Sequence, residues 1–428
     1  MKSLFFYGKA GIEIEVPGGV NCREVRSRKT VAVPDEAAAV EAALDAPIAC
    51  EALIDLARGK KSAAISVCDI TRPAPNRITL PPLLRRLHQA GIAREDVVIL
   101  IATGLHRAAT PEEVDIIVGP EIAREYRVVS HNARAREEHR FLGETRRGTP
   151  VYVDERFVSA DLHITLGFVE QHLMLGFSGG RKLVVPGLAA QETIKVIHSP
   201  KFIREPLATE GSIDGNPLHQ ELLECARMAR HDFIVDVALT QDRKIAGVFA
   251  GNPVKAHAAG VEFVEKACLE EVDEAADVVI TSAAGFPLDL TFYQSVKGIT
   301  AATHLAKPGG RILLVAECAE GMGSAEFARM IRGMGEFAQY LDEVREQSVD
   351  VDRWQVEKLA VAGVQNEVYF YVPGVRKEEL GRLGERTFDS LNEAIAAMLH
   401  GLPRDGRVTL VPEGPYTFAR ARAQVGVN

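Results

Sequence analysis

Residues 63–75, AAISVCDITRPAP, contain the pattern that decides the fold. A short apolar run, 63–67, ends directly in a polar loop that begins at Asp69. Similar β-branched runs recur along the chain and alternate with longer helix-like stretches. This alternation is typical of parallel sheets covered by helices on both faces, so we expect an α/β fold.

The pattern predicts two α/β domains of unequal size. The expected strands are 63–67, 97–102, 162–165, 233–239, 276–281, 311–316, 367–372 and 408–411. The expected helices are 36–44, 81–90, 191–197, 219–229, 256–269, 324–334 and 391–400. An acidic stretch before the strand at 276 marks the boundary. We expect an N-terminal α/β domain over 1–270, a C-terminal α/β domain over 275–403 and an active-site cleft between them; 404–428 can close back on either half.

Composition excludes several classes of protein. The chain has 428 residues, of which 46% are hydrophobic and 25% charged, and its formal charge is −9, which argues against a binder of nucleic acid or of an anionic membrane. No apolar run approaches the ~18 residues that span a bilayer. The six cysteines form no Cys-x-x-Cys pair, and the N-terminus turns polar too early for a signal peptide. We expect a cytoplasmic protein without nucleic-acid or membrane partners.

Chemically dense segments follow four of the expected strands. Ligands of open α/β sheets bind beyond the carboxyl ends of the strands. Glycine is gathered there with His, Arg or Lys in 103–107, 167–182 and 285–298, and Arg72 follows the first strand. A purely structural protein does not need glycine together with His, Arg or Lys at all of these points. The pattern therefore favours a ligand-binding site.

Each of these residues also has a plain structural interpretation. Asp69 can start a turn, although a guanidinium held still by Pro73 suits capture of a carboxylate. His106, His172 and His198 can be hydrogen-bonded loop or cap residues, and no pair of them has the His-x-x-x-His spacing of a helix-borne zinc site.

Nucleotide-binding motifs are absent in their standard form. The stretch 176–182 is rich in glycine, but Lys182 is followed by Leu183, so it is not a P-loop, and the Rossmann fingerprint does not occur. The single tryptophan, Trp354, is by itself more typical of a core anchor than of a ligand wall.

Taken in order, these segments resemble the nickel-pincer lactate racemase family. The five motifs that carry the resemblance are Asp69-x-x-Arg72-Pro73, Gly104-Leu105-His106-Arg107, Gln171-His172 with 176–182, His198-Ser199-Pro200 and Tyr293-Gln294-x-x-Lys297-Gly298. Trp354 extends the match into the last quarter of the chain. No single motif would be specific, but five in the family's order are.

The resemblance implies a tethered nickel cofactor. The family carries a nickel-pincer nucleotide (pyridinium-3-thioamide-5-thiocarboxylic acid mononucleotide nickel) with two sulfur-containing arms, one of them joined to a lysine. That lysine would be Lys182, with Gly179 and Gly180 beside the cofactor, and His198 would be the one imidazole ligand of nickel. Soft sulfur and imidazole ligands suit a square-planar nickel centre. Cofactor-synthesis enzymes of the host would have to supply the group.

The resemblance also implies the reaction, inversion of the hydroxyl-bearing carbon of a small 2-hydroxy acid by hydride transfer through a 2-oxo acid. The residues implied to act on the substrate are His106 and His172 as acid and base, Arg72 and Lys297 on the carboxylate, Tyr293 and Gln294 in the pocket, Asp69 as an orienting group, and Trp354 as a wall.

Three alternatives remain at this point. The first is an epimerase of a larger 2-hydroxy acid, such as a sugar acid or an aromatic or dicarboxylic acid. The second is a Ser/His hydrolase, because residues 176–180 match the letters Gly-x-Ser-x-Gly around Ser178. The third is a carrier or sensor that binds the cofactor without turnover.

Overall fold

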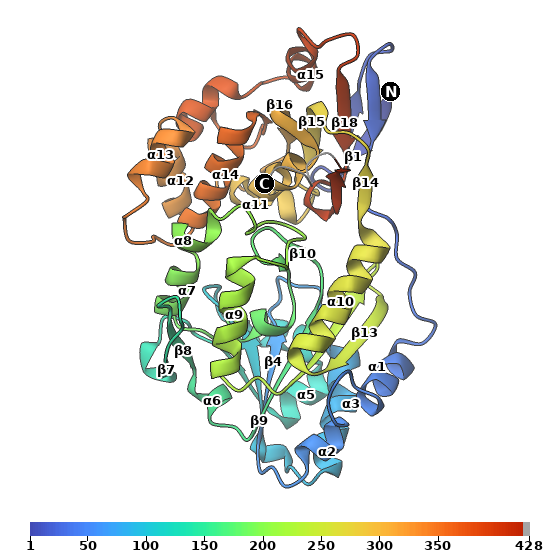
Figure 1. Cartoon of the computed structure of the whole chain (residues 1–428), viewed down its shortest axis with the longest axis vertical. Helices are drawn as coiled ribbons and strands as arrows, with labels where there is room; N and C mark the ends of the chain where they lie inside the picture. The colour runs from blue at the N-terminus through green and yellow to red at the C-terminus, as the bar shows by residue number, and fades with distance from the viewer. Residues whose placement is uncertain (423–428) are drawn as a thin grey trace. The chain divides into compact units, whose positions relative to one another are not determined.

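Residues 1–422 are described by the computed structural model and divide into two units (Figure 1). The N-terminal unit comprises 29–198 and 205–267. The C-terminal unit comprises 1–28, 199–204 and the chain from 268 onward. Among residues 1–422, no helix has both the length and the apolar character that crossing a membrane would require.

The N-terminal unit is built on a six-stranded sheet with the order β13-β12-β9-β4-β5-β6. Its strands are β4 (Ala63–Cys68), β5 (Val97–Ala102), β6 (Arg127–Ser130), β9 (Leu162–Phe168), β12 (Phe233–Leu239) and β13 (Ile245–Gly251). All neighbours pair in parallel except β13, which is antiparallel to β12. Every residue of β4 and β9 is buried, which is why both read as apolar runs.

The helices of the N-terminal unit complete the predicted α/β pattern, and α1 and α3 pack against strands of the sheet. They include α1 (Glu36–Asp45), α3 (Asn76–Gln89), α7 (Gln191–Ile197), α9 (Pro217–Met228) and α10 (Pro253–Cys268). The helix expected from 81 begins at Asn76 and contains Pro81 and Pro82 in its interior. Each proline removes a backbone donor, but the helix buries Leu80, Leu83, Leu84 and Leu87, and this apolar burial outweighs the missing hydrogen bonds.

The C-terminal unit contains a five-stranded, fully parallel sheet with the order β17-β16-β15-β18-β3. Its strands are β3 (Asn21–Glu24), β15 (Ala276–Ser282), β16 (Ala306–Val315), β17 (Glu367–Tyr371) and β18 (Arg407–Val411). Its helices include α11 (Phe292–Thr303), α12 (Ala325–Gly333), α14 (Arg353–Gln365) and α15 (Leu391–Leu399). Both sheets therefore confirm the expected α/β class.

The division of the chain differs from the expected one at the N-terminus. Residues 1–28 belong to the C-terminal unit, because β3 pairs with β18 and the hairpin of β1 (Lys2–Phe5) and β2 (Ile12–Glu15) packs on that unit's core. Strand β3 has the sequence NCRE, which contains no apolar run from which a strand could be predicted. The segment from 404 likewise lies with the C-terminal unit as far as the structure describes it.

Candidate active site

The strand order of the N-terminal unit reverses between β4 and β9. The chain proceeds from β4 to β5 and β6 on one side, and from β9 to β12 on the other. At such a switch point the loops after the two strands separate and leave room for a ligand. The loop after β4 begins at Asp69, and the loop after β9 contains Glu170 and His172.

Asp69 and His106 form a hydrogen-bonded pair at this edge. His106 Nδ1 donates to Asp69 Oδ2 at 2.7 Å, and Thr71 Oγ1 donates to Asp69 Oδ1 at 2.6 Å. Burial alone would raise the pKa of Asp69, but these hydrogen bonds and the charge of Arg72 lower that pKa overall. The ionised carboxylate keeps the proton of His106 on Nδ1, so Nε2 keeps its lone pair, as a general base requires. The His106 side chain is 56% exposed and can reach a ligand.

His172 is held as the other neutral tautomer, with its ring proton on Nε2. It ends β10 (Gln171–His172), which pairs with β11 (Gly176–Phe177) in a short hairpin. The N–H groups of Met174 and Leu175 donate to His172 Nδ1, each at 3.3 Å, so the ring proton lies on Nε2. A Cβ at Gly176 would collide with the carbonyl of Ser212, and its φ is +74°, so the tight hairpin requires glycine. Nε2 of His172 is thus a hydrogen-bond donor in this neutral ring, and only the imidazolium form would act as a general acid.

Arg72 connects the loops after the two central strands. Its Nη1 lies 3.4 Å from Glu170 Oε1, and its side chain is about one-third exposed. The family resemblance implies that Arg72 binds a substrate carboxylate, whereas nothing in the motifs points to Glu170. A guanidinium has five N–H donors, so binding one carboxylate oxygen at this distance leaves donors for another anion.

Lys182 lies in η3 (Gly180–Leu183), just after two glycines with positive φ, +85° at Gly179 and +44° at Gly180. The Gly180 N–H donates to Asp236 Oδ1 at 3.2 Å. A Cβ on Gly179 would lie 2.6 Å from Asp236 Oδ2, so this turn tolerates no side chain there. The two glycines therefore place the lysine loop directly against a carboxyl group of β12.

Asp236 and Arg181 were not identified from the sequence. Arg181 is 1% exposed and donates from Nη2 to the carbonyls of Leu175 and Phe177. Burial raises the pKa of Asp236 to about 7, although the Gly180 N–H and Arg181 oppose that shift. The sequence did contain one indication of Asp236, an acidic residue inside the apolar run 233–239. Burying a carboxyl group in a strand costs free energy unless it has a hydrogen-bond partner, so such a residue suggests a special role.

The positive charges of Arg72 and Lys182 change the pKa values of neighbouring groups at the switch point. Burial raises the pKa of the Cys68 thiol to about 12, and the positive charges of Arg72 and Lys182 act to lower it. Loss of hydration lowers the pKa of His198 to about 4, and the charge of Lys182 acts in the same direction. Lys182 therefore lies within electrostatic reach of both the Asp69–Arg72 loop and His198.

His198 caps the end of α7 and has the form of a metal ligand. Its Nδ1 donates to the carbonyl of Ile194 at 2.8 Å, which leaves the lone pair on Nε2. Its low pKa makes the ring neutral at pH 7. Within residues 1–422, no group of three or more His, Cys, Asp or Glu side chains is arranged to hold a metal ion. A neutral imidazole with its lone pair on Nε2 fits the single protein ligand of the nickel cofactor that the resemblance implies.

The C-terminal unit gathers the other predicted site residues around α11. Lys297 Nζ donates to Gln294 Oε1 at 2.6 Å, and Trp354 Nε1 donates to the Tyr293 hydroxyl at 3.3 Å. Trp354 is 9% exposed and so also anchors α14 to α11. A Cβ at Gly298 would collide with the carbonyl of Ser282 at the end of β15, so glycine allows this helix to lie on the strand.

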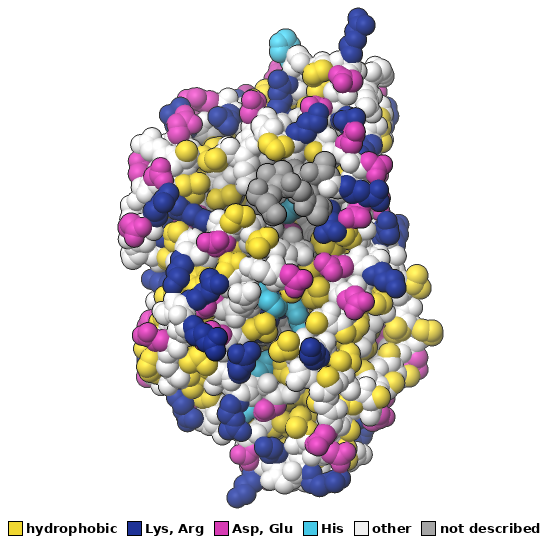
Figure 2. All heavy atoms as spheres, viewed as in Figure 1, with side chains coloured by type: hydrophobic (Ala, Val, Ile, Leu, Met, Phe, Trp, Pro, Cys, Tyr) yellow, Lys and Arg dark blue, Asp and Glu magenta, His cyan; other side chains and the backbone are white. Residues whose placement is uncertain are grey.

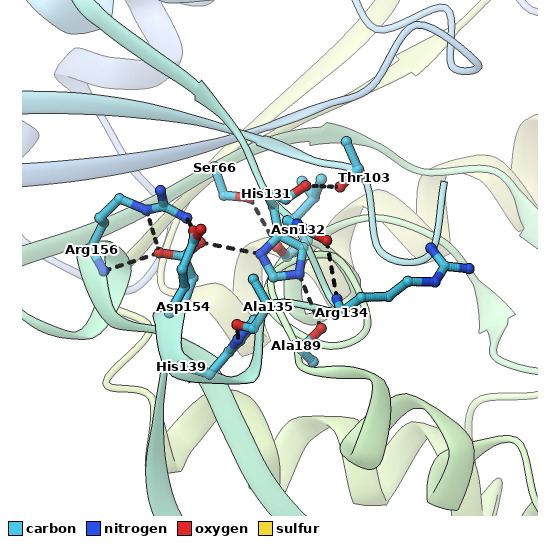
Figure 3. A network of polar contacts seen from close by, with 12 residues as sticks. Ser66, Thr103, His131, Asn132, Arg134, Ala135, His139, Asp154, Arg156 and Ala189 are labelled. Carbon is cyan, nitrogen blue, oxygen red and sulfur yellow. Dashed lines mark hydrogen bonds and ion pairs between the residues drawn. The ribbon is translucent and has the colours of Figure 1, made fainter. Parts of the chain in front are cut away.

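Several histidine side chains lie near one another in the middle of the view in Figure 2, among acidic and basic side chains. A buried network of polar contacts is centred on His131, and it includes Thr103, Asp154 and Arg156 (Figure 3). His131 contacts Asp154 Oδ2 at 3.1 Å, and Arg156 binds both oxygens of that carboxylate. Burial would raise the pKa of Asp154, but the hydrogen bonds from His131 and Arg156 lower it to about 2.

This network predicts an acid-dependent loss of stability. An unfolded aspartate has a pKa of ~3.9, so the pairing of Asp154 stabilises the fold fully above that pH and is lost as the pH falls through about 2. By pH ~3 the fold should have lost about 1 kcal/mol from this group. Urea unfolding at pH 6 and pH 3 should show a correspondingly smaller pH effect in Asp154→Asn than in the original chain. Equal pH effects in both proteins would contradict the assignment.

The chain matches two family models, the lactate racemase N-terminal domain over residues 7–211 and the lactate racemase C-terminal domain over residues 272–417. It is 33% identical to the lactate racemase of Thermoanaerobacterium thermosaccharolyticum over 423 residues, 97% of this chain and 98% of the relative. It is 35% identical to the lactate racemase of Lactiplantibacillus plantarum over 381 residues, 88% of this chain and 89% of the relative.

Solved structures agree with these sequence matches. The lactate racemase apoprotein from T. thermosaccharolyticum superposes with a TM-score of 0.90 at 32% identity, covering 98% of this chain and all of that one. A protein from Thermotoga maritima shares the fold, with a TM-score of 0.68 at 17% identity, over 92% of this chain and all of that one. The fold and these matches define the chain as an enzyme of the isomerase class. It belongs to the lactate racemase family, which confirms the resemblance drawn from its motifs.

Proposed function

We propose that the chain inverts the hydroxyl-bearing C2 centre of a small 2-hydroxy acid, with lactate as the first substrate to test. The family supports this proposal. The observation that carries it is the pair of histidines at the switch-point edge, one with a lone pair on Nε2 and the other with a proton on Nε2. Inversion needs one group that takes the hydroxyl proton and one that returns it.

The chemistry of the substrate determines what these histidines do. The C2–H bond beside a carboxylate is weakly acidic, so C2 loses hydride rather than a proton and becomes the planar carbon of a 2-oxo acid. In one direction His106 Nε2 accepts the hydroxyl proton as hydride leaves C2. His172, in its imidazolium form, donates a proton to the oxygen when hydride returns to the other face, which leaves His172 neutral and His106 as the imidazolium. The opposite enantiomer exchanges the two roles, and Asp69 keeps the His106 ring oriented in both directions.

Lys182 and His198 would hold the nickel-pincer nucleotide that the family resemblance implies. Lys182 supplies a single amine at the glycine turn, and His198 supplies a neutral imidazole, which is the form that binds a metal. The chemistry that the bound group supplies is acceptance of the C2 hydride and its return. Burial of the neighbouring turn against Asp236 fixes the origin of the lysine side chain.

Substrate binding is assigned to the side chains that the family resemblance implies. Arg72 and Lys297 are proposed to bind the substrate carboxylate. Tyr293 and Gln294 shape the pocket, and Trp354 forms a wall behind the Tyr293 hydroxyl. Gln294 restrains Lys297 through its 2.6 Å hydrogen bond, which lowers the entropic cost of presenting that ammonium group to an anion.

The test is direct turnover by protein co-produced with enzymes that synthesise the nickel-pincer nucleotide. Each pure lactate enantiomer is incubated with the protein, and the products are separated by chiral chromatography. We expect each enantiomer to approach an equal mixture. A panel of sugar, aromatic and dicarboxylic 2-hydroxy acids identifies a larger substrate if one reacts faster. Failure to invert any of them, in protein that carries the cofactor, would contradict the proposal.

Ser178 provides a prediction that separates the racemase from the hydrolase alternative. Its Oγ donates to the carbonyl of Phe168 at 2.8 Å and accepts from the Glu170 N–H at 3.1 Å, so it fixes the turn after β9. Ser178→Ala should retain most of the inversion activity and lose about 0.5–1.5 kcal/mol of stability. Activity is measured by chiral chromatography and stability by urea unfolding. A serine hydrolase would instead show no inversion in the original chain and a hydrolytic activity that Ser178→Ala abolishes at unchanged stability.

A further inference from the structure

Three segments that carry proposed site residues meet at one buried histidine, His131 (Figure 3). His131 directly follows β6 and is 1% exposed. It has no place in the chemistry proposed above, and none of the sequence motifs includes it. Its contacts nevertheless reach the loop of His106, the loop of Lys182 and the start of the helix that ends at His198.

The first connection is to the Lys182 loop. His131 Nε2 lies 3.0 Å from the carbonyl of Ala189. The same loop is closed by the Gly187 N–H, which donates to the carbonyl of Lys182 at 3.0 Å. The N–H of Asp154, whose carboxylate binds the His131 ring, donates to the carbonyl of Leu188 at 2.9 Å. The chain just after Lys182 is thus tied twice to the His131–Asp154 pair.

The second connection is to the His106 loop. Thr103 Oγ1 donates to the carbonyl of His131 at 2.7 Å, and the His131 N–H donates to the carbonyl of Ile101 at 3.1 Å. The His106 N–H in turn donates to the carbonyl of Thr103 at 2.9 Å. A further bond from the Gly104 N–H to the carbonyl of Gly187 joins the two loops directly.

The third connection is to helix α7. The N–H of Gln191, its first residue, donates to the carbonyl of Ala133 at 2.8 Å. Ala133 lies two residues after His131, so the same segment sets where the helix starts. A seven-residue helix transmits that position to its cap, His198.

The ring of His131 is itself fixed by a buried carboxylate. Asp154 is fully buried, and its Oδ2 lies 3.1 Å from His131 Nδ1. Arg156 holds the same carboxylate, with Nη2 donating to Oδ2 at 2.6 Å and Nε donating to Oδ1 at 2.8 Å. Each ring nitrogen of His131 faces one acceptor oxygen, Nδ1 that of Asp154 and Nε2 that of Ala189. The ring plane is therefore determined by Asp154 on one side and by Ala189 on the other.

We propose that His131 is a positioning residue that sets the relative placement of His106, Lys182 and His198, with Asp154 orienting its ring. The proposal rests on the proposed function, because it assumes that these three residues act on one cofactor and substrate. It assigns to His131 no contact with either. A buried hydrogen bond at such a junction contributes to activity through pre-organisation of the groups that react.

Two substitutions separate the two contacts of the ring. In His131→Gln the side-chain amide can replace Nε2 as donor to Ala189, and in His131→Asn it can replace Nδ1 as donor to Asp154 but does not reach Ala189. His139→Asn is the matched control. The His139 ring packs edge-on against the His131 ring, with 4.9 Å between the ring centroids. Its Nδ1 bonds to the carbonyl of Ala135 in its own loop. All variants are co-produced with the cofactor-synthesis enzymes.

The readouts are the fraction of chains with a mass increase on the Lys182 peptide, nickel per chain, and the melting temperature of the apoprotein. We expect His131→Asn to lower adduct and nickel roughly five- to tenfold, the equivalent of one lost hydrogen bond. His131→Gln should restore most of both, and His139→Asn should change only the melting temperature. Wild-type levels of adduct and nickel in His131→Asn would overturn the proposal. It would also be overturned if the loss of adduct and nickel in the three variants simply paralleled their loss of melting temperature.

Amide hydrogen exchange on the apoproteins keeps this test independent of the cofactor. The positioning role predicts faster exchange at residues 187–191 in His131→Asn than in His131→Gln, and equal exchange in both would overturn it. If His131→Asn does not fold, Thr103→Val removes one bond of the same cluster at nearly constant volume and should accelerate exchange in the His106 loop. Wild-type protein without a Lys182 adduct would contradict the proposed function, while the exchange result would still decide this inference.

Discussion

Replacing His106 or His172 by alanine should abolish inversion of 2-hydroxy acids while the cofactor remains in place. General acid–base catalysis by a positioned side chain contributes ~10²–10⁴-fold, and each enantiomer needs both groups. Each variant should therefore lose at least about 10²-fold in kcat with lactate of either hand. Neither imidazole is proposed as a metal ligand, so nickel per chain and the Lys182 adduct should stay at wild-type levels.

A matched control for these variants is His400→Ala, since His400 is exposed beyond the end of α15. It should leave the turnover number unchanged. Loss of nickel in His106→Ala or His172→Ala would contradict their assignment and would make the affected residue a metal ligand. Retention of inversion in either variant would remove that residue from the acid–base pair.

Replacing Lys182 by alanine should have the second large effect. The variant lacks the amine that is proposed to hold the cofactor covalently, so the Lys182 peptide should show no added mass and inversion should fall to background. Lys182→Arg should behave in the same way, because a guanidinium remains protonated and is a poor nucleophile. Intact-mass and peptide-mass spectrometry measure the adduct, and metal analysis measures nickel.

Lys195→Arg is the matched control for the lysine variants, since Lys195 lies on α7 close to His198 in sequence. It should retain adduct, nickel and activity. An added mass that persists on a chain lacking Lys182 would place the attachment elsewhere. Wild-type inversion by Lys182→Ala would contradict the covalent tether.

Much of the fold could be predicted because its central strands are buried on both faces. Strands such as β4 and β12 are apolar runs of the expected length, and their observed bounds lie within a residue of those predicted. Strand β3 could not be predicted, because the sequence Asn-Cys-Arg-Glu has no apolar run and becomes a strand only by pairing with β18, where Asn21 lies opposite Arg407. The membership of residues 1–28 in the C-terminal unit follows from that same pairing.

The candidate site was predictable where chemistry follows directly on a strand. Asp69, His106 and His172 lie in such loops, and the structure adds the hydrogen bonds that fix the tautomers of the two histidines. Their catalytic roles stay predictions. Asp236 and His131 were not recognised, because their significance lies in contacts with segments far away in sequence, the glycine turn at 180 and the carbonyl of Ala189.

The most direct test of hydride transfer at C2 uses lactate labelled with deuterium at that carbon. The loaded protein is incubated with one labelled enantiomer in ordinary water, and the opposite enantiomer is isolated and weighed by mass spectrometry. If C2 loses and regains hydride inside the protein, the inverted product keeps its deuterium. Inverted product that carries hydrogen from the solvent at C2 would show removal of a proton instead, and would contradict the account.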